Sequence, residues 1–142
     1  MVRYMRWIYA GLFWVISAAL VVQFFLAGWG VFAFAGIPPF DPHCALGDLI
    51  GIAILLGIPL AFAARVPWRT TGINFGLFVL MFIQATLAFA PQRGIAALHV
   101  VNAVLIFGVT LLLTREATTI ARSARAPAPT QAPLAADVTR SS

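Results

Sequence analysis

The chain contains four long apolar runs, and they restrict its fold more than any other feature. The runs are Trp7–Gly30, Cys44–Ala64, Gly72–Ala90 and Gly94–Leu113. A helix needs about 20 apolar residues to cross the hydrocarbon core of a bilayer. Only helices and closed barrels satisfy every backbone group in that environment, and runs of this length are too long for barrel strands. The sequence therefore predicts four transmembrane helices.

The segments between the runs are short, which restricts how the helices pack. Short connections place consecutive helices side by side and antiparallel. We therefore expect an all-α membrane protein with an antiparallel up-down four-helix transmembrane bundle as one domain, residues 1–122. Residues 123–142 are rich in Ala, Pro, Ser and Thr and predict a disordered cytoplasmic tail. A cleaved signal peptide is the alternative interpretation of the first run, but the length of that run and its Gln23 favour a membrane helix.

The arginines predict the orientation of the bundle. The chain carries a net charge of +5, and all of its basic residues are arginines, most of them near the ends of apolar runs. This placement suits orientation in a bilayer and does not indicate nucleic-acid binding. The arginines concentrate before the first run, between the second and third runs, and after the fourth. The positive-inside rule then predicts a bacterial inner-membrane protein with both termini cytoplasmic.

Polar residues inside the apolar runs gather at one predicted depth. With the helices antiparallel, six of them fall in the outer third of the bilayer: Gln23, His43, Asp48, Gln84, His99 and Asn102. The inner two-thirds is expected to be almost purely apolar. Polar side chains are costly in a membrane, so each needs a partner or a function.

The two histidines suggest the function. His43 and His99 come from the second and fourth helices at similar depth, and two facing imidazoles can supply the axial ligands of a b-type haem. Gly47 and Gly51 follow His43 on the same helix face and could provide space for a flat macrocycle. Three residues of the same outer layer complete the predicted cofactor site: Gln84, Asn102 and Arg93.

Other interpretations of the polar layer stay open. Glycines spaced by four residues also serve helix packing, and amides can simply bond between helices. The chain could then be an accessory subunit of a larger respiratory or photosynthetic membrane complex. A third alternative is a divalent metal or small polar ligand site formed by His43, Asp48 and His99. A phosphate loop, a metalloprotease motif and a nucleophile elbow are all absent from the sequence, so no catalytic residue is expected.

The motif His43-x-x-x-Gly47-x-x-x-Gly51, together with Leu98-His99-Val-Val-Asn-Ala103, resembles one half of haem A synthase. It also resembles small four-helix bacterial membrane proteins with a glutamine in the third helix, which Gln84 matches. The resemblance implies a haem-binding bundle with His43 and His99 as iron ligands. A single haem near the outer face could not carry electrons across the apolar inner region, so we expect a redox partner outside or within the membrane. The synthase contains two such bundles and this chain has one, so only haem ligation carries over from the resemblance.

Overall fold

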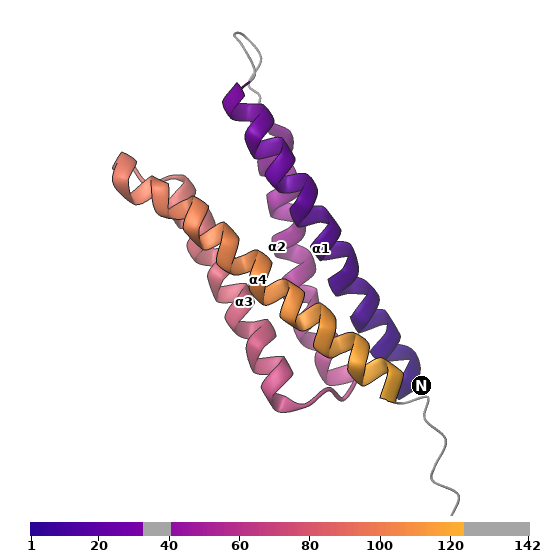
Figure 1. The fold of residues 1–142 in the computed structure, drawn as a ribbon. Coiled ribbons are helices and arrows are strands. Elements are labelled where there is room, and N and C mark those ends of the chain that lie inside the picture. The colour runs from indigo at the N-terminus through magenta and orange to yellow at the C-terminus, as the bar shows by residue number, and fades with distance from the viewer. Residues whose placement is uncertain (33–40, 124–142) are drawn as a thin grey trace, which may run out of the picture.

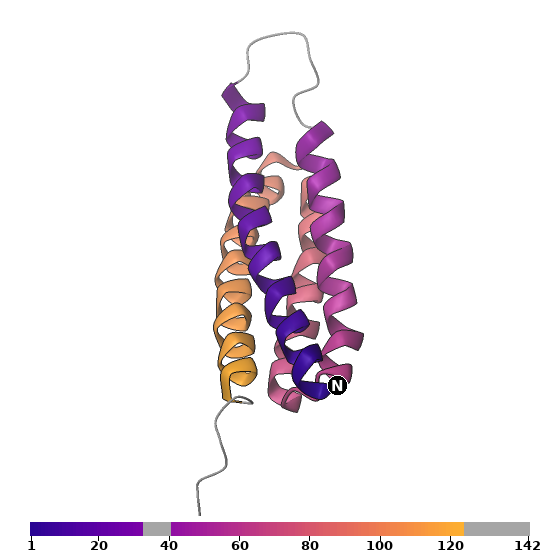
Figure 2. The ribbon, with the colours of Figure 1, turned by 90° about the vertical axis from the view of Figure 1, so that its right-hand side faces the viewer.

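The computed structural model describes residues 1–32 and 41–123 and shows a bundle of four helices (Figures 1 and 2). The helices are α1 (Val2–Phe32), α2 (Asp41–Ala63), α3 (Trp68–Ala88) and α4 (Arg93–Ser123). Each contains a segment long and apolar enough to cross a membrane. The expected all-α fold with four transmembrane helices is confirmed, and the chain is a multi-pass membrane protein.

Two predicted helix ends differ markedly from the structure. α1 begins at Val2 instead of Trp7, and α4 continues to Ser123 instead of ending at Leu113. The prediction followed the apolar runs, which mark only the part of a helix that lies in hydrocarbon. Beyond Leu113 the α4 helix continues through charged residues, which the water interface tolerates. Apart from Ser123, the predicted disordered tail lies outside the described residues.

The helices form a square in which each packs against two neighbours. α1 contacts α2 and α4, and α3 also contacts α2 and α4, so α2 and α4 lie across one diagonal. The start of α1 and the end of α4 share one end of the bundle (Figures 1 and 2). We call this the proximal end, and the end where α2 and α4 begin the distal end. The α1–α2 and α3–α4 hairpins diverge toward the distal end (Figure 1).

A tightly packed core fills the proximal half of the bundle. Its largest fully buried apolar side chains come from all four helices: Tyr9, Phe13, Ile16, Ile54, Leu77, Ile106 and Leu113. Many large apolar side chains lie on the outside instead, among them Val15, Leu56 and Phe82. An apolar exterior is unfavourable in water and suits lipid, where hydrocarbon tails replace solvent.

Serine and threonine side chains are buried in this core and form hydrogen bonds between helices. The expectation of an almost purely apolar inner region is therefore wrong. Ser17 Oγ and Thr114 Oγ1 lie 2.9 Å apart, and Thr114 also donates to the Phe13 carbonyl at 3.1 Å. These bonds tie α1 to α4. Serine and threonine hydroxyls can bond to a carbonyl of their own helix, as Thr110 does to Ile106. They therefore enter an apolar run without interrupting it.

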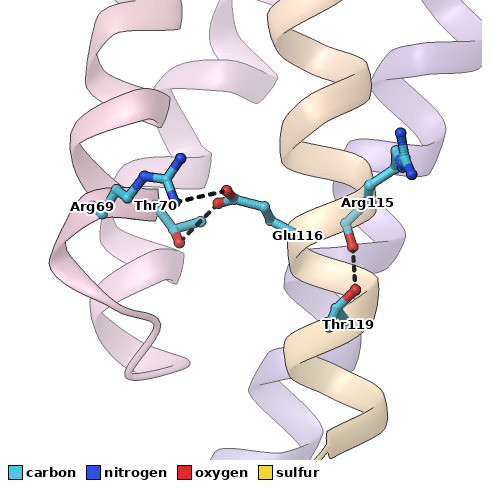
Figure 3. Close-up of polar contacts among 5 residues, drawn as sticks. All are labelled: Arg69, Thr70, Arg115, Glu116 and Thr119. Carbon is cyan, nitrogen blue, oxygen red and sulfur yellow. Dashed lines mark hydrogen bonds and ion pairs between the residues drawn. The ribbon is translucent and has the colours of Figure 1, made fainter.

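A carboxylate joins α3 to α4 at the proximal end (Figure 3). Glu116 Oε2 accepts a hydrogen bond from Thr70 Oγ1 at 3.1 Å, and its other oxygen lies 3.9 Å from Arg69 Nη1. The Arg69 side chain is 83% exposed, so solvent screens the ion pair and it contributes little to stability. The hydrogen bond to the buried Thr70 is the more specific contact.

One buried amide lacks partners. The side chain of Asn74 is fully buried, and neither its nitrogen nor its oxygen makes a hydrogen bond of standard geometry among the described residues. The polar group that lies near it is the Tyr9 hydroxyl, which is also buried. The amide packs against Gly57, where an added Cβ would lie 2.9 Å from Asn74 Nδ2 and 3.5 Å from Phe13 Cζ. The absence of a side chain at Gly57 therefore makes room for Asn74. A buried unsatisfied amide costs free energy in a core.

We expect Asn74→Leu to stabilise the protein. Leucine has a similar size and removes two unsatisfied polar atoms, so the free energy of unfolding should rise by about 1 kcal/mol. Thermal unfolding in detergent, followed by circular dichroism, measures this. A large decrease in stability would show that the Asn74 amide makes an important contact. The control is Asn74→Ala, which removes the same amide and leaves a void, and which should destabilise the core.

Candidate functional site: a cavity between two histidines

A cavity of about 270 Å³ lies in the distal half, where the two hairpins diverge. All four helices line it, and most of the lining is apolar. One lining residue from each helix lies deepest toward the core, and we call these four the floor: Leu20, Ile50, Met81 and Ile106. Below the floor, the packed core closes the bundle.

His43 and His99 both line this cavity, one from each helix of the α2–α4 diagonal. Their ring centroids are 6.3 Å apart and the ring planes are tilted by 57°. The structure thus brings together the two histidines that the sequence singled out. With a metal–nitrogen bond of about 2 Å on each side, two imidazoles that share one metal lie roughly 6 Å apart between ring centres.

Gln84 and Asn102 determine the protonation of His99. Asn102 Nδ2 donates to the Leu80 carbonyl at 2.9 Å and to Gln84 Oε1 at 2.8 Å, so the Gln84 amide nitrogen faces His99. That nitrogen lies 3.0 Å from His99 Nε2 and can only donate. His99 Nε2 therefore carries the lone pair, and Nδ1–H donates to the Gln84 carbonyl at 3.1 Å. A ligand bound at Nε2 would replace the Gln84 amide there.

Gln23 holds His43 in a comparable way. His43 Nδ1 lies 3.3 Å from the Gln23 carbonyl, and the Gln23 side-chain nitrogen donates to the His43 carbonyl at 2.8 Å. Since a carbonyl only accepts, His43 carries its proton on Nδ1. Both histidines thus bond through Nδ1 to the carbonyl of a glutamine on the preceding helix. A backbone carbonyl on one ring nitrogen is the usual support for a histidine that binds metal through the other.

The cavity has an approximate two-fold symmetry that relates the α1–α2 hairpin to the α3–α4 hairpin. The α1 lining residues Leu20, Gln23, Phe24 and Ala27 correspond, with identical spacing, to Met81, Gln84, Ala85 and Ala88 of α3. The α2 lining residues His43, Cys44, Gly47 and Ile50 correspond in the same way to His99, Val100, Ala103 and Ile106 of α4. The two histidines are therefore equivalent positions of two similar halves.

The same correspondence extends into the core and into the sequence. Tyr9, Ala10, Phe13 and Ile16 of α1 match Thr70, Thr71, Asn74 and Leu77 of α3, and all eight are buried. Residues 43–56 (HCALGDLIGIAILL) and 99–112 (HVVNAVLIFGVTLL) share the histidine, a Leu-Ile pair and a Leu-Leu pair. Sequence reasoning missed this internal repeat because most matched positions are apolar, and apolar residues recur by chance in any membrane helix.

The two predicted glycines differ in their surroundings. Gly47 lines the cavity, and a Cβ there would lie 3.1 Å from Gln23 Nε2, so this glycine lets Gln23 reach the His43 carbonyl. Gly51 is not among the residues that line the cavity, and a Cβ there would lie 3.7 Å from Met81 Cε. Other small residues that line the cavity are alanines of α1, α3 and α4: Ala27, Ala85, Ala88 and Ala103.

Four further residues lie at or near the edge of the site: Asp48, Cys44, Arg93 and Asn102. Asp48 and Cys44 line the cavity and are exposed. Asp48 has no hydrogen bond or ion pair among the described side chains, and the support for His99 that it could have provided comes from Gln84. Arg93 is the first residue of α4, and its side chain lies outside the described part of the structure. Asn102 contacts Gln84 from outside the cavity lining.

The donor set around the cavity is small. No group of three or more His, Cys, Asp or Glu side chains that could hold a metal ion occurs in residues 1–32 and 41–123. A bare divalent ion generally needs at least three protein ligands. A haem iron receives four nitrogens from its porphyrin and needs at most two from the protein. The spacing of the histidines, their Nδ1 bonds and the apolar cavity fit such a group.

These features define a class of protein, a multi-pass four-helix membrane bundle with a two-histidine cavity. Residues 23–91 match DUF6220, a family of unknown function. The matched segment runs from Gln23 through α2 and α3 and includes His43 and Gln84, and it ends before His99. No curated protein and no solved structure shows significant similarity to the chain.

We expect Asn102→Leu to destabilise the protein, opposite to the same change at Asn74. The Asn102 amide makes two hydrogen bonds between α4 and α3, and their loss should lower the free energy of unfolding by about 1–2 kcal/mol. Thermal unfolding in detergent compares the two Asn→Leu variants directly. Equal shifts in both variants would contradict the assignment of these contacts.

Proposed function

We propose that this chain is a small haem b-binding membrane protein in which His43 and His99 are the axial ligands of the iron. The observation that supports this most is their equivalence: the two histidines lie at corresponding positions of two similar hairpins, across one cavity. A haem iron has two axial positions that are chemically alike. A ligand that binds on the approximate two-fold axis of the cavity uses both histidines in the same way.

The surrounding residues suit this role. Gln23 and Gln84 place the ring protons on Nδ1 and leave Nε2 of each histidine as the nitrogen with the lone pair. Gly47, Ala27, Ala88 and Ala103 line the cavity without large side chains. The resemblance of the two histidine motifs to haem A synthase supports the same ligands.

A haem in this cavity would supply one-electron redox chemistry. The packing of the bundle determines from which end a redox partner can approach it. The floor and the packed core separate the cavity from the proximal end of the bundle. A bound haem would therefore exchange electrons with a partner at the distal end or within the membrane. The role of the protein would be electron transfer or haem handling. The described residues hold no arrangement that indicates catalysis, so we propose a non-catalytic protein.

The arginines support a bacterial inner-membrane location with both termini cytoplasmic. Arg3, Arg6, Arg69, Arg115 and Arg122 lie toward the proximal ends of their helices, and Arg65 lies in the connection between α2 and α3 at the same end. By the positive-inside rule, the proximal end faces the cytoplasm and the cavity lies near the outer face.

We expect the full-length protein, purified in mild detergent from haem-replete cells, to show the reduced-minus-oxidised α band of a bis-histidine haem b. His43→Ala and His99→Ala should each abolish this band, because each removes one axial ligand. Added imidazole should restore part of it, since the vacated position remains open to a free ligand.

Matched controls are Leu49→Ala and Leu105→Ala, which change corresponding exposed residues of α2 and α4 outside the cavity lining and should keep the band. A colourless wild-type protein would contradict the proposal. Copurification of a colourless protein with a large respiratory or photosynthetic complex would favour an accessory subunit instead.

The orientation has its own test. A fluorescent protein that folds only in the cytoplasm, fused after Ser142, should be bright, and an alkaline phosphatase fused there should be inactive. The same two reporters inserted between α1 and α2 should give the reverse result. Phosphatase activity at the C-terminal fusion would overturn the assigned orientation.

A further inference from the structure

The two halves of the bundle differ at the lines where neighbouring hairpins meet. We call these lines the α1–α4 seam and the α2–α3 seam. The approximate two-fold symmetry relates one seam to the other, so residues that close one can be compared with their counterparts on the other. If the two halves were identical, side chains of the same size would fill both seams. The side chains that fill the two seams differ.

Two aromatic rings close the α1–α4 seam beside the cavity. Phe24 of α1 and Phe107 of α4 form an edge-to-face pair with ring centroids 5.6 Å apart. Phe24 lines the cavity and is 39% exposed, so its side chain reaches both the cavity and the outside of the bundle. Such pairs are favourable beyond the apolar area that they bury.

The corresponding positions on the α2–α3 seam carry small residues. Phe24 corresponds to Ala85 of α3, and Phe107 corresponds to Gly51 of α2. Ala85 and Ala88 of α3 line the cavity and are exposed, and so is Phe89, which directly follows α3. On the α2 side, the exposed cavity-lining residues are Cys44 and Asp48. The Phe24–Phe107 ring pair therefore has no counterpart among the described residues of the α2–α3 seam, where the one phenylalanine that lines the cavity, Phe89, lies beyond the end of α3 and is 84% exposed.

We propose that the α2–α3 seam is a lateral passage through which a porphyrin enters the cavity from the lipid phase. This inference rests on the proposed function. Large apolar side chains are exposed on both helices that border this seam, among them Ile52 of α2 and Phe82 of α3, so lipid surrounds it. Haem is flat, largely apolar and partitions into membranes, and it reaches the two histidines from the membrane without crossing the packed core.

The test closes one seam and opens the other at positions outside the cavity lining. Gly51→Phe copies the Phe107 ring onto the α2–α3 seam, where the nearest atom to an added Cβ is Met81 Cε at 3.7 Å. Phe107→Ala removes the ring from the α1–α4 seam. Ile52→Phe is the control, because Ile52 follows Gly51 on α2 and is 55% exposed.

The full-length protein from haem-depleted cells is reconstituted in liposomes, and two probes are added from donor liposomes. Haemin reports binding through its absorbance, and metal-free protoporphyrin IX, which needs no histidine ligand, reports through quenching of tryptophan fluorescence. Release is followed by transfer to an excess of empty liposomes.

We expect Gly51→Phe to slow both uptake and release roughly tenfold while the amount bound at equilibrium stays the same, because a narrowed passage raises one barrier in both directions. Phe107→Ala should speed both processes, and Ile52→Phe should change neither. If Gly51→Phe does not fold, Gly51→Leu, which places a smaller side chain on the same seam, takes its place and should also slow both processes. Unchanged rates in the folded variants would overturn the passage.

The two proposals fail in different ways. If protoporphyrin uptake depends on the seam residues while haemin absorbance does not depend on His43 or His99, the ligand assignment is wrong and the passage stands. If haemin binds through both histidines at rates that ignore the seam residues, the passage is wrong and the ligand assignment stands. If neither porphyrin binds, both are wrong.

Discussion

The absence of hydrogen-bond partners in hydrocarbon determines how this bundle is organised. A polar side chain inside a membrane must find its partner within the protein. Gln84 illustrates the result, because its carbonyl, its amide oxygen and its amide nitrogen each contact a group on α4. The orientation of His99 follows from these contacts and not from packing alone. The polar groups of the distal half thus hold two helix pairs in register and set the direction of the imidazoles.

The approximate symmetry explains which polar groups are satisfied and which are not. Gln84 Oε1 accepts from Asn102, whereas the corresponding oxygen of Gln23 is buried without a partner among the described residues. The reason is that the counterpart of Asn102 on α2 is Leu46, which has no donor. Asp48 is a second departure, since its counterpart on α4 is Val104. Leu46 and Asp48 both lie on α2 close to the cavity. The α2 side of the cavity therefore differs in polarity from the α4 side.

The sequence predicted the four helices and the pairing of His43 with His99, because apolar length and antiparallel packing fix both. It did not predict that Asn74, Thr70 and Glu116 contribute polar groups near the proximal end. Asn74 lies within an apolar run, where one amide hardly changes the average hydropathy. Thr70 and Glu116 lie just outside the predicted runs, where the apolar pattern offered no helix to place them on. Gly51 was assigned to the cofactor site because it shares a helix face with His43. The structure turns that face toward Met81, and only neighbouring helices could reveal this.

The repeated hairpin has a consequence for how such a bundle can be assembled. A single α1–α2 unit already contains one histidine, one supporting glutamine and one side of the floor. Two identical copies of it, related by a two-fold axis along the membrane normal, would reproduce the same square with both histidines at the centre. Closed two-fold dimers are the commonest symmetric assemblies of identical chains. In this chain the two units are covalently joined, so their sequences are free to diverge, and one interface can close while the other stays open.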